Sequence, residues 1–375
     1  MTVVHLRRAE PGLVVIAPER APLVTDAAPG LDVLVLEVSG GHLSWSLFGD
    51  QVVPAAVLDD VEAAQDWVWA VYGEAVASAV ADDQPAALTA LPARPESTAA
   101  LRRLAYAHWA SRWWPASTVD GIPALDPQLL VEEIEALTEQ CEMMFDGDID
   151  ERSGALGAGA GLGTEVASDG GGDVELFDAP GDRGPEGDGA SIGRSRGRAE
   201  DYALAAGGAD SPDGLIVARG SGGWDWRRCP PGILDAGEHA VSWQVSRAAG
   251  VSTVRVSVVA APDCRRRVPE HLRPHARVRV RLSADTGDDR PEPDVEMSLH
   301  LRGDAWTSSA RIPGTPESSP EITIFVPGAG PADQQEDESA ARNRIRRFAR
   351  ARLTEHTGDQ RLTAETAAAE TDEDF

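Results

Sequence analysis

Residues 106–117 read Tyr-Ala-His-Trp-Ala-Ser-Arg-Trp-Trp-Pro-Ala-Ser, and the N-terminal half of the chain is organised around them. Apolar residues at helical spacing precede and enter this stretch, so it forms the second half of a helix that Ser97 or Thr98 can cap. Pro115 should end that helix, because proline lacks a backbone donor and clashes with the preceding turn. The sequence therefore predicts a helix that stops at two adjacent tryptophans.

A second helix follows the first after a short connector. Asp126-Pro127 places an N-cap residue before a proline at the first helical position, which is a strong start signal. Apolar side chains then recur on one face, and glutamates fill the rest. The apolar face consists of Leu130, Ile134, Leu137, Cys141 and Met144.

Strand patterns precede these helices. Leu13–Ile16 and Val33–Val38 are apolar runs rich in β-branched residues, and Ser39–Gly41 predicts a hairpin turn into the alternating segment His42–Phe48. From Val57 to Ala79 apolar residues recur at helical spacing, which predicts one helix of five to six turns. Residues 1–148 are therefore expected to form an α+β domain with a small sheet and about three helices.

The rest of the chain divides into three segments of different composition. Residues 149–211 are rich in Gly, Ala, Asp and Ser and predict a disordered acidic linker. Residues 212–328 alternate at period two in six or seven segments, which predicts an all-β, sandwich-like domain. Residues 329–375 predict a tail with one short basic amphipathic helix, Ala340–Leu353, that binds a partner groove or folds back on the acidic half.

Composition excludes several classes of function. The net charge of −28 argues against a nucleic-acid-binding protein and against attraction to an anionic membrane surface. The chain has no lysine and is rich in Ala and Gly, which is typical of a bacterial genome of high GC content. It lacks a signal-peptide pattern and a long apolar run, so we expect a cytoplasmic protein. We find no catalytic, phosphate-loop or cofactor motif and therefore expect no cofactor.

The aromatic helix contains candidate binding residues. His108, with Trp109 and Arg112 nearby, is suited to a ligand pocket in which a histidine acts beside a tryptophan face. The simpler interpretation is that these aromatic residues pack the helix against the rest of its domain. Trp113 and Trp114 are adjacent and cannot both face one core from a helix, so one of them is a candidate interface anchor. Alternatively, both rings cover core from a bent chain.

Two further groups of residues were considered as sites. Arg277, Arg279 and Arg281 alternate with apolar residues and suit an acidic partner or a phosphate, although a solvated sheet face produces the same pattern. A loose set of potential zinc ligands lacks a paired Cys-x-x-Cys, so we expect no metal site. That set consists of Cys229, Cys264, His271 and His275.

These observations favour a non-enzymatic function. We expect a cytoplasmic bacterial adaptor or accessory subunit that holds another protein through its two domains, without indication of the oligomeric state. The alternative is an enzyme or ligand-binding regulator with a pocket in the N-terminal domain near His108 and Trp109. The predicted binding residues are His108, Trp109, Arg112, Trp113, Trp114, Arg277, Arg279 and Arg281.

Overall fold

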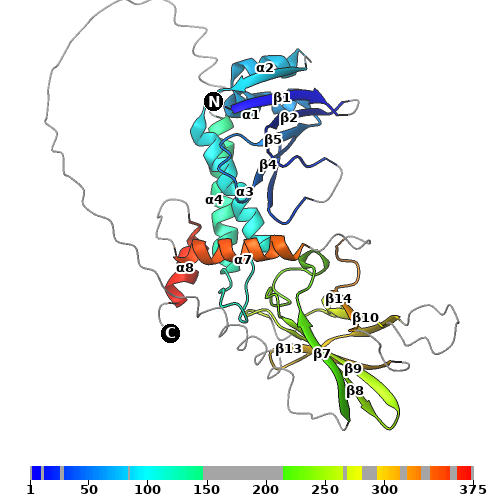
Figure 1. The fold of residues 1–375 in the computed structure, drawn as a ribbon. Helices are drawn as coiled ribbons and strands as arrows, with labels where there is room; N and C mark the ends of the chain where they lie inside the picture. The colour runs from blue at the N-terminus through cyan, green and yellow to red at the C-terminus, as the bar shows by residue number, and fades with distance from the viewer. Residues whose placement is uncertain are drawn as a thin grey trace, which may run out of the picture.

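The computed structural model describes residues 2–9, 12–25, 29–82, 85–146, 214–264, 268–280, 294–312, 319–330, 338–354 and 361–372. They form an N-terminal region with a sheet and helices, and a C-terminal region of antiparallel sheets (Figure 1). The predicted linker, residues 149–211, lies outside the described residues.

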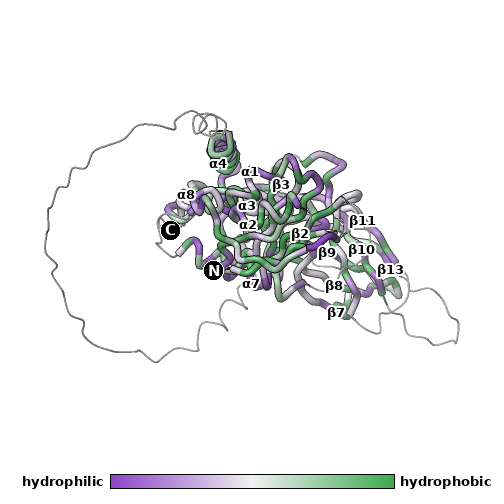
Figure 2. Tube along the Cα trace, turned by 90° about the horizontal axis from the view of Figure 1, so that it is seen from above, coloured by the Kyte–Doolittle hydropathy of each residue, from purple (hydrophilic) through white to green (hydrophobic). Residues whose placement is uncertain are grey.

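The N-terminal region is built on a six-stranded sheet of order β3-β4-β5-β2-β1-β6, in which every neighbouring pair is antiparallel. The predicted hairpin is confirmed, because Val38 pairs with Gly41 across a turn. Green apolar segments of the chain run through this sheet around β2 and β3 (Figure 2). The strands are β1 Thr2–Arg8, β2 Val14–Pro18, β3 Val33–Val38, β4 Gly41–Ser46, β5 Ala55–Leu58 and β6 Ala86–Ala90.

The single helix predicted from Val57 to Ala79 is wrong. Its beginning belongs to β5, a strand in the middle of the sheet whose four residues are all buried. The helical part is divided into α1 (Val61–Tyr72) and α2 (Glu74–Ala81) at Gly73, which has φ 89° and ψ 171°. The apolar period continues through β5, α1 and α2, so it does not show where one element ends and the next begins. Burial in the sheet makes the first segment a strand, and the backbone conformation of Gly73 separates the two helices.

Substitution of Gly73 by alanine is expected to lower the free energy of unfolding by about 3 kcal/mol or more. The backbone conformation is nearly exclusive to glycine, and an added Cβ would lie 2.2 Å from the Leu91 carbonyl oxygen. Gly121→Ala is the matched control, because Gly121 also has a positive φ (63°) but no atom within 4 Å of the added Cβ, so about 1 kcal/mol is expected. Urea unfolding measures both; equal losses would contradict the contribution of the Leu91 contact.

The two long helices are confirmed, but the cap predicted for the first one is wrong. That helix begins at Pro95, so Ser97 and Thr98 lie buried inside it and do not cap it. α3 (Pro95–Trp113) ends before Pro115, and α4 (Pro127–Asp146) begins at the predicted Asp126 cap, whose Oδ1 accepts the amides of Gln128 at 2.8 Å and Leu129 at 3.3 Å. α3 packs against α4 and β3, so the buried aromatic residues of α3 complete the N-terminal core.

The C-terminal region contains a five-stranded sheet, β12-β13-β9-β8-β7, and a three-stranded sheet, β11-β10-β14, with antiparallel neighbours throughout. The period-two pattern is confirmed in β9, where Val254, Val256 and Val258 are fully buried. The strands are β7 Leu215–Gly222, β8 Val241–Ala248, β9 Val251–Val259, β10 His275–Arg279, β11 Asp294–Ser298, β12 His300–Arg302, β13 Ala305–Ile312 and β14 Glu321–Phe325.

The C-terminal segment folds back onto the chain. α7 (Ser339–Thr354) crosses between the two regions (Figure 1), and its Phe348 ring packs edge-to-face on Phe48, Tyr106 and Trp109. Of the two interpretations of the basic helix, the structure shows the intramolecular one.

A second C-terminal helix, α8 (Thr363–Asp372), forms where only an acidic tail was expected. Its fully buried Glu365 accepts the Leu362 amide at 2.8 Å and the Tyr106 hydroxyl at 2.6 Å, and it pairs with Arg352. Its Ala-rich sequence lacks an apolar period, so α8 depends on these tertiary contacts.

Candidate functional site

The end of α3 places the two adjacent tryptophans. Trp113 is the last helical residue, and Trp114 leaves the helix with φ −58° and ψ 125°, as Pro115 requires. Both tryptophans are half-buried, so neither is fully exposed and neither is fully enclosed in the core. The Trp114 Nε1–H donates to the Pro123 carbonyl at 2.9 Å, which ties the indole to the connector between α3 and α4.

A segment of the C-terminal region faces this connector. It carries Trp224 and a short 3₁₀ helix, η1 (Trp226–Arg228), capped by the Asp225 carboxylate. Trp224 Nε1–H donates to the Asp235 carbonyl at 2.7 Å, so this indole is also fixed by a backbone acceptor. Four tryptophans from segments more than 100 residues apart therefore meet in one place.

These tryptophans line a cleft of about 780 Å³, which we call the tryptophan cleft. Its walls come from the α3–α4 junction, from the loop around 224–236, and from residues 261–263 and 268–269, and they are mostly apolar. The volume lies within the range of sites that hold a small molecule or a short peptide segment. Its lining residues include Arg112, Trp113, Trp114, Trp224, Trp226 and Cys229.

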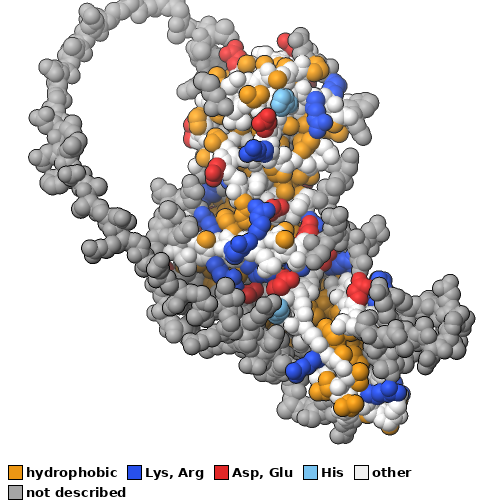
Figure 3. Space-filling view, viewed as in Figure 1, with side chains coloured by type: hydrophobic (Ala, Val, Ile, Leu, Met, Phe, Trp, Pro, Cys, Tyr) orange, Lys and Arg blue, Asp and Glu red, His pale blue; other side chains and the backbone are white. Residues whose placement is uncertain are grey.

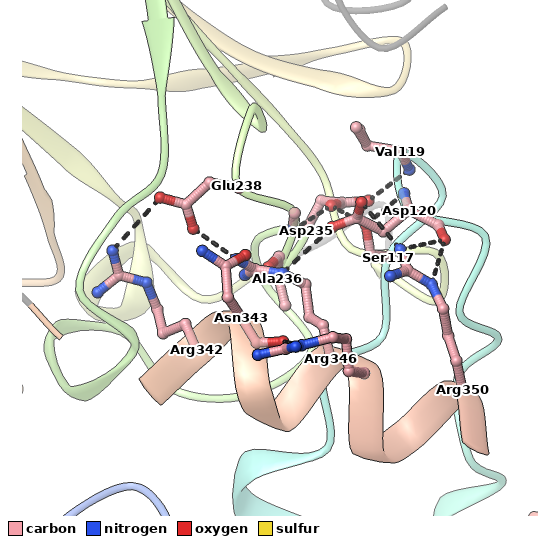
Figure 4. Close-up of polar contacts among 12 residues, drawn as sticks. Ser117, Val119, Asp120, Asp235, Ala236, Glu238, Arg342, Asn343, Arg346 and Arg350 are labelled. Atoms are coloured by element: carbon pink, nitrogen blue, oxygen red, sulfur yellow. Dashed lines mark hydrogen bonds and ion pairs between the residues drawn. The ribbon is translucent and has the colours of Figure 1, made fainter. Parts of the chain in front are cut away.

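Beside the tryptophan cleft, the buried carboxylate of Asp235 joins the connector after α3 to the loop around 224–236, and Figure 4 shows its contacts with Ser117 and Val119. Asp235 is fully buried, and its side chain accepts the Ser117 hydroxyl at 2.6 Å and the amides of Thr118 at 2.7 Å, Val119 at 3.4 Å and Gly237 at 2.8 Å. The two segments approach so closely that a Cβ on Gly237 would lie 3.0 Å from Ser117 Oγ and 3.1 Å from Val119 Cβ.

The Ser117–Asp235 pair has a structural role. Burial raises the pKa of Asp235, while the hydrogen bonds from Ser117 and the three amides oppose that shift. Ser117 is itself fully buried, and its oxygen also accepts the Asp120 amide at 2.9 Å. A serine enclosed in this way has no access to a substrate, so the pair holds the connector rather than supplying a nucleophile.

Helix α7 adds an ion-pair network to the same junction (Figure 4). The Arg346 guanidinium is nearly buried, donates to the Ala236 carbonyl at 2.9 Å and pairs with Glu238 at 2.5 Å and with Asp120 at 3.4 Å. Arg350 also pairs with Asp120, at 3.0 Å, and Arg342 with Glu238, at 3.7 Å. Blue arginine side chains gather with acidic ones at the level of α7 (Figure 3). This network connects the C-terminal helix to both walls of the tryptophan cleft.

The predicted residues of α3 separate into two groups. Trp109 is buried, donates to the Leu31 carbonyl at 2.7 Å and stacks on Tyr106, so it belongs to the core. His108 is exposed, although neighbouring protein atoms desolvate its imidazole enough to lower its pKa. Neither residue lines the tryptophan cleft, whereas Arg112, Trp113 and Trp114 do.

The predicted arginine row lies elsewhere. Arg277 pairs with Glu296 at 3.2 Å and with Asp294 at 3.8 Å, and Arg279 pairs with Glu321 at 3.6 Å. Arg281 lies outside the described residues. The two described arginines therefore already have carboxylate partners on the neighbouring strands of their sheet.

The cysteines and histidines considered for zinc have other surroundings. His275 contacts Glu296 at 3.1 Å, and among the described residues no group of three or more His, Cys, Asp or Glu side chains is placed to hold a metal ion. Burial raises the pKa of Cys229 to about 12; the Arg112 guanidinium opposes this shift, and Cys264 adds to it. A thiol with such a pKa is a poor nucleophile.

Cys229 is therefore expected to resist alkylation in the native protein at pH 8, where its thiolate fraction is about one in ten thousand. Half-buried Cys264 should react with iodoacetamide first, and both should react rapidly in urea. Peptide mass spectrometry over a time course measures each rate. Fast native labelling of Cys229 would indicate a reactive thiol in the tryptophan cleft.

Sequence reasoning did not find Trp224, Trp226 and Asp235. No local pattern marks them, because Trp226 starts the one-turn helix η1 while Trp224 and Asp235 lie in the irregular chain on either side of it, between β7 and β8. Their signal was the concentration of two tryptophans within three residues of an otherwise polar segment.

Comparison of the chain with known proteins identifies no relative. No protein-family model matches the chain, and neither a curated protein nor a solved structure matches it. Within the described part of the chain, no helix has the length and apolar character needed to cross a membrane. The tryptophan cleft is therefore interpreted from its own chemistry.

Proposed function

We propose that this chain is a non-enzymatic cytoplasmic bacterial adaptor that holds a segment of a partner protein in the tryptophan cleft. The supporting observation is the cleft itself, in which four tryptophans from both regions surround about 780 Å³. Tryptophan is enriched among the residues that dominate binding energy at protein interfaces, since it combines a large apolar face with a donor.

The chemistry of the walls favours binding over catalysis. The thiol that lines the cleft, Cys229, has a pKa far above neutrality, and the buried Ser117 belongs to the junction rather than to the surface. We further infer that the two C-terminal sheets pack as a sandwich, an architecture that often presents loops to partners. In this interpretation the loop around 224–236 is the binding loop.

Trp113→Ala is expected to weaken partner binding by about 30-fold, as the loss of a central tryptophan costs about 2 kcal/mol. Trp113 is the sharper choice, because Trp114 also holds the connector through Pro123. The matched control is Trp243→Ala, which removes a half-buried tryptophan of β8 that does not line the cleft.

The experiment is a pull-down from native extract with tagged full-length wild type, Trp113→Ala and Trp243→Ala, quantified by mass spectrometry. Partners that the cleft holds are lost with Trp113→Ala and kept with Trp243→Ala. If Trp113→Ala retains every specific partner of the wild type, the cleft is not the adaptor surface.

A further inference from the structure

The tryptophan cleft carries hydrogen-bond donors that the chain does not use. Trp114 and Trp224 donate to backbone carbonyls, but for Trp113 Nε1 and Trp226 Nε1 the described residues provide no acceptor. The Arg112 guanidinium lies over the Trp113 ring at 4.9 Å and, within the described ranges, makes neither a hydrogen bond nor an ion pair. Unused donors in an apolar site favour a ligand with acceptors.

Among the described residues, three charged side chains line the cleft, one cation (Arg112) and two carboxylates (Asp126 and Asp263). Arg112 is the lining cation whose field reaches buried Cys229, where it opposes the effect of burial on the thiol. Two lining carboxylates have other positions: Asp126 caps α4, and Asp263 lies exposed on the loop at 261–264. Neither of them contributes to the shift of Cys229.

We propose that the tryptophan cleft binds an extended peptide segment that carries apolar side chains and a carboxylate, and that this carboxylate pairs with Arg112. The inference rests on the proposed adaptor function and names the chemistry of its partner. The contact with the Trp113 ring, 4.9 Å from the guanidinium carbon to the ring centroid, restricts where the Arg112 donors lie before the ligand arrives. Extended backbone has free carbonyl oxygens, which suit the indole N–H donors of Trp113 and Trp226.

A selection from a random dodecapeptide display library on the full-length protein tests this proposal. Peptides that bind wild type but not Trp113→Ala should share an aspartate or glutamate next to apolar residues. This enrichment would be contrary to the net charge of −28, so non-specific electrostatic attraction cannot produce it.

Synthetic peptides from the selection then enter a double-mutant cycle. Arg112→Gln should weaken binding about tenfold or more, and so should replacement of the peptide's acidic residue by its amide. The two changes combined should weaken binding little more than either one alone, because each already removes the same ion pair. Arg302→Gln removes the same charge from exposed Arg302 on β12, away from the cleft, and should leave the affinity unchanged.

The outcomes separate the two proposals. Peptides that require Trp113 but lack an acidic residue, or that ignore Arg112→Gln, would overturn the carboxylate pairing and leave the adaptor function standing. If the library yields no peptide that requires Trp113, the peptide-binding function of the cleft fails, and the carboxylate pairing fails with it.

Discussion

Asp235→Ala is expected to lower the free energy of unfolding by about 3–5 kcal/mol, since it removes the acceptor of four donors at once. The Ser117 hydroxyl and the Gly237 amide would be left without this partner in the interior, where each such loss costs about 1–3 kcal/mol. The amides of Thr118 and Val119 are closer to solvent, so water can compensate part of their loss.

The measurement is urea unfolding followed by tryptophan fluorescence, which reports on the same junction because Trp224 donates to the Asp235 carbonyl. Asp235→Asn is the matched control: it keeps the size and one acceptor oxygen and should cost less than the alanine variant. If the two variants are equally stable, the hydrogen bonds to this carboxylate do not contribute as proposed. Loss of cleft binding with retained fold would show that Asp235 positions the walls.

Arg346→Ala should also be strongly destabilising, by about 3 kcal/mol or more. The Arg346 side chain is only 3% exposed, and without it Glu238 and Asp120 each lose a cationic partner. It also lies over the Trp226 ring at 5.6 Å, so its loss removes packing from a wall of the tryptophan cleft. Burial lowers the pKa of Arg346, whereas Glu238 and Asp120 raise it. The two carboxylates therefore stabilise the buried charge of the guanidinium.

The adjacent residue of the same helix provides the control for this experiment. Arg347 is exposed, and its hydrogen-bond partner among the described residues is the Asn343 carbonyl of its own helix, so Arg347→Ala should change the stability by no more than about 0.5 kcal/mol. A double variant of Arg346→Ala with Glu238→Gln should lose less than the sum of the two single losses. Additive losses would show that the pair is not coupled across the junction.

Local patterns predicted the regular elements well where one face is buried. Val33–Val38 forms the strand that its β-branched residues indicate, and Asp126-Pro127 starts α4 as its cap chemistry requires. Local pattern failed at Ala55–Leu58, because a fully buried central strand has no alternation to distinguish it from helix. It also failed for α8, which is defined by buried contacts of Glu365.

The candidate site was predicted only in part. Arg112 was predicted as a neighbour of His108, and Trp113 and Trp114 because two adjacent tryptophans cannot both face one core; all three line the cleft. His108 and Trp109 were selected with them, yet burial of Trp109 and the position of His108 keep both outside it. Side chains on one helix diverge to different faces, so closeness in sequence did not mean a shared site.

The sequence by itself determined the α+β and β-rich regions, the end of the aromatic helix at Pro115 and the acidic charge of the chain. The tertiary structure decided that Trp224 and Trp226 join Trp113 and Trp114, and that Asp235 bonds the connector more than 100 residues before it. The physical reason is that periodicity and caps record interactions between residues a few positions apart. A donor and an acceptor brought together by folding leave no spacing in the sequence from which their meeting can be inferred.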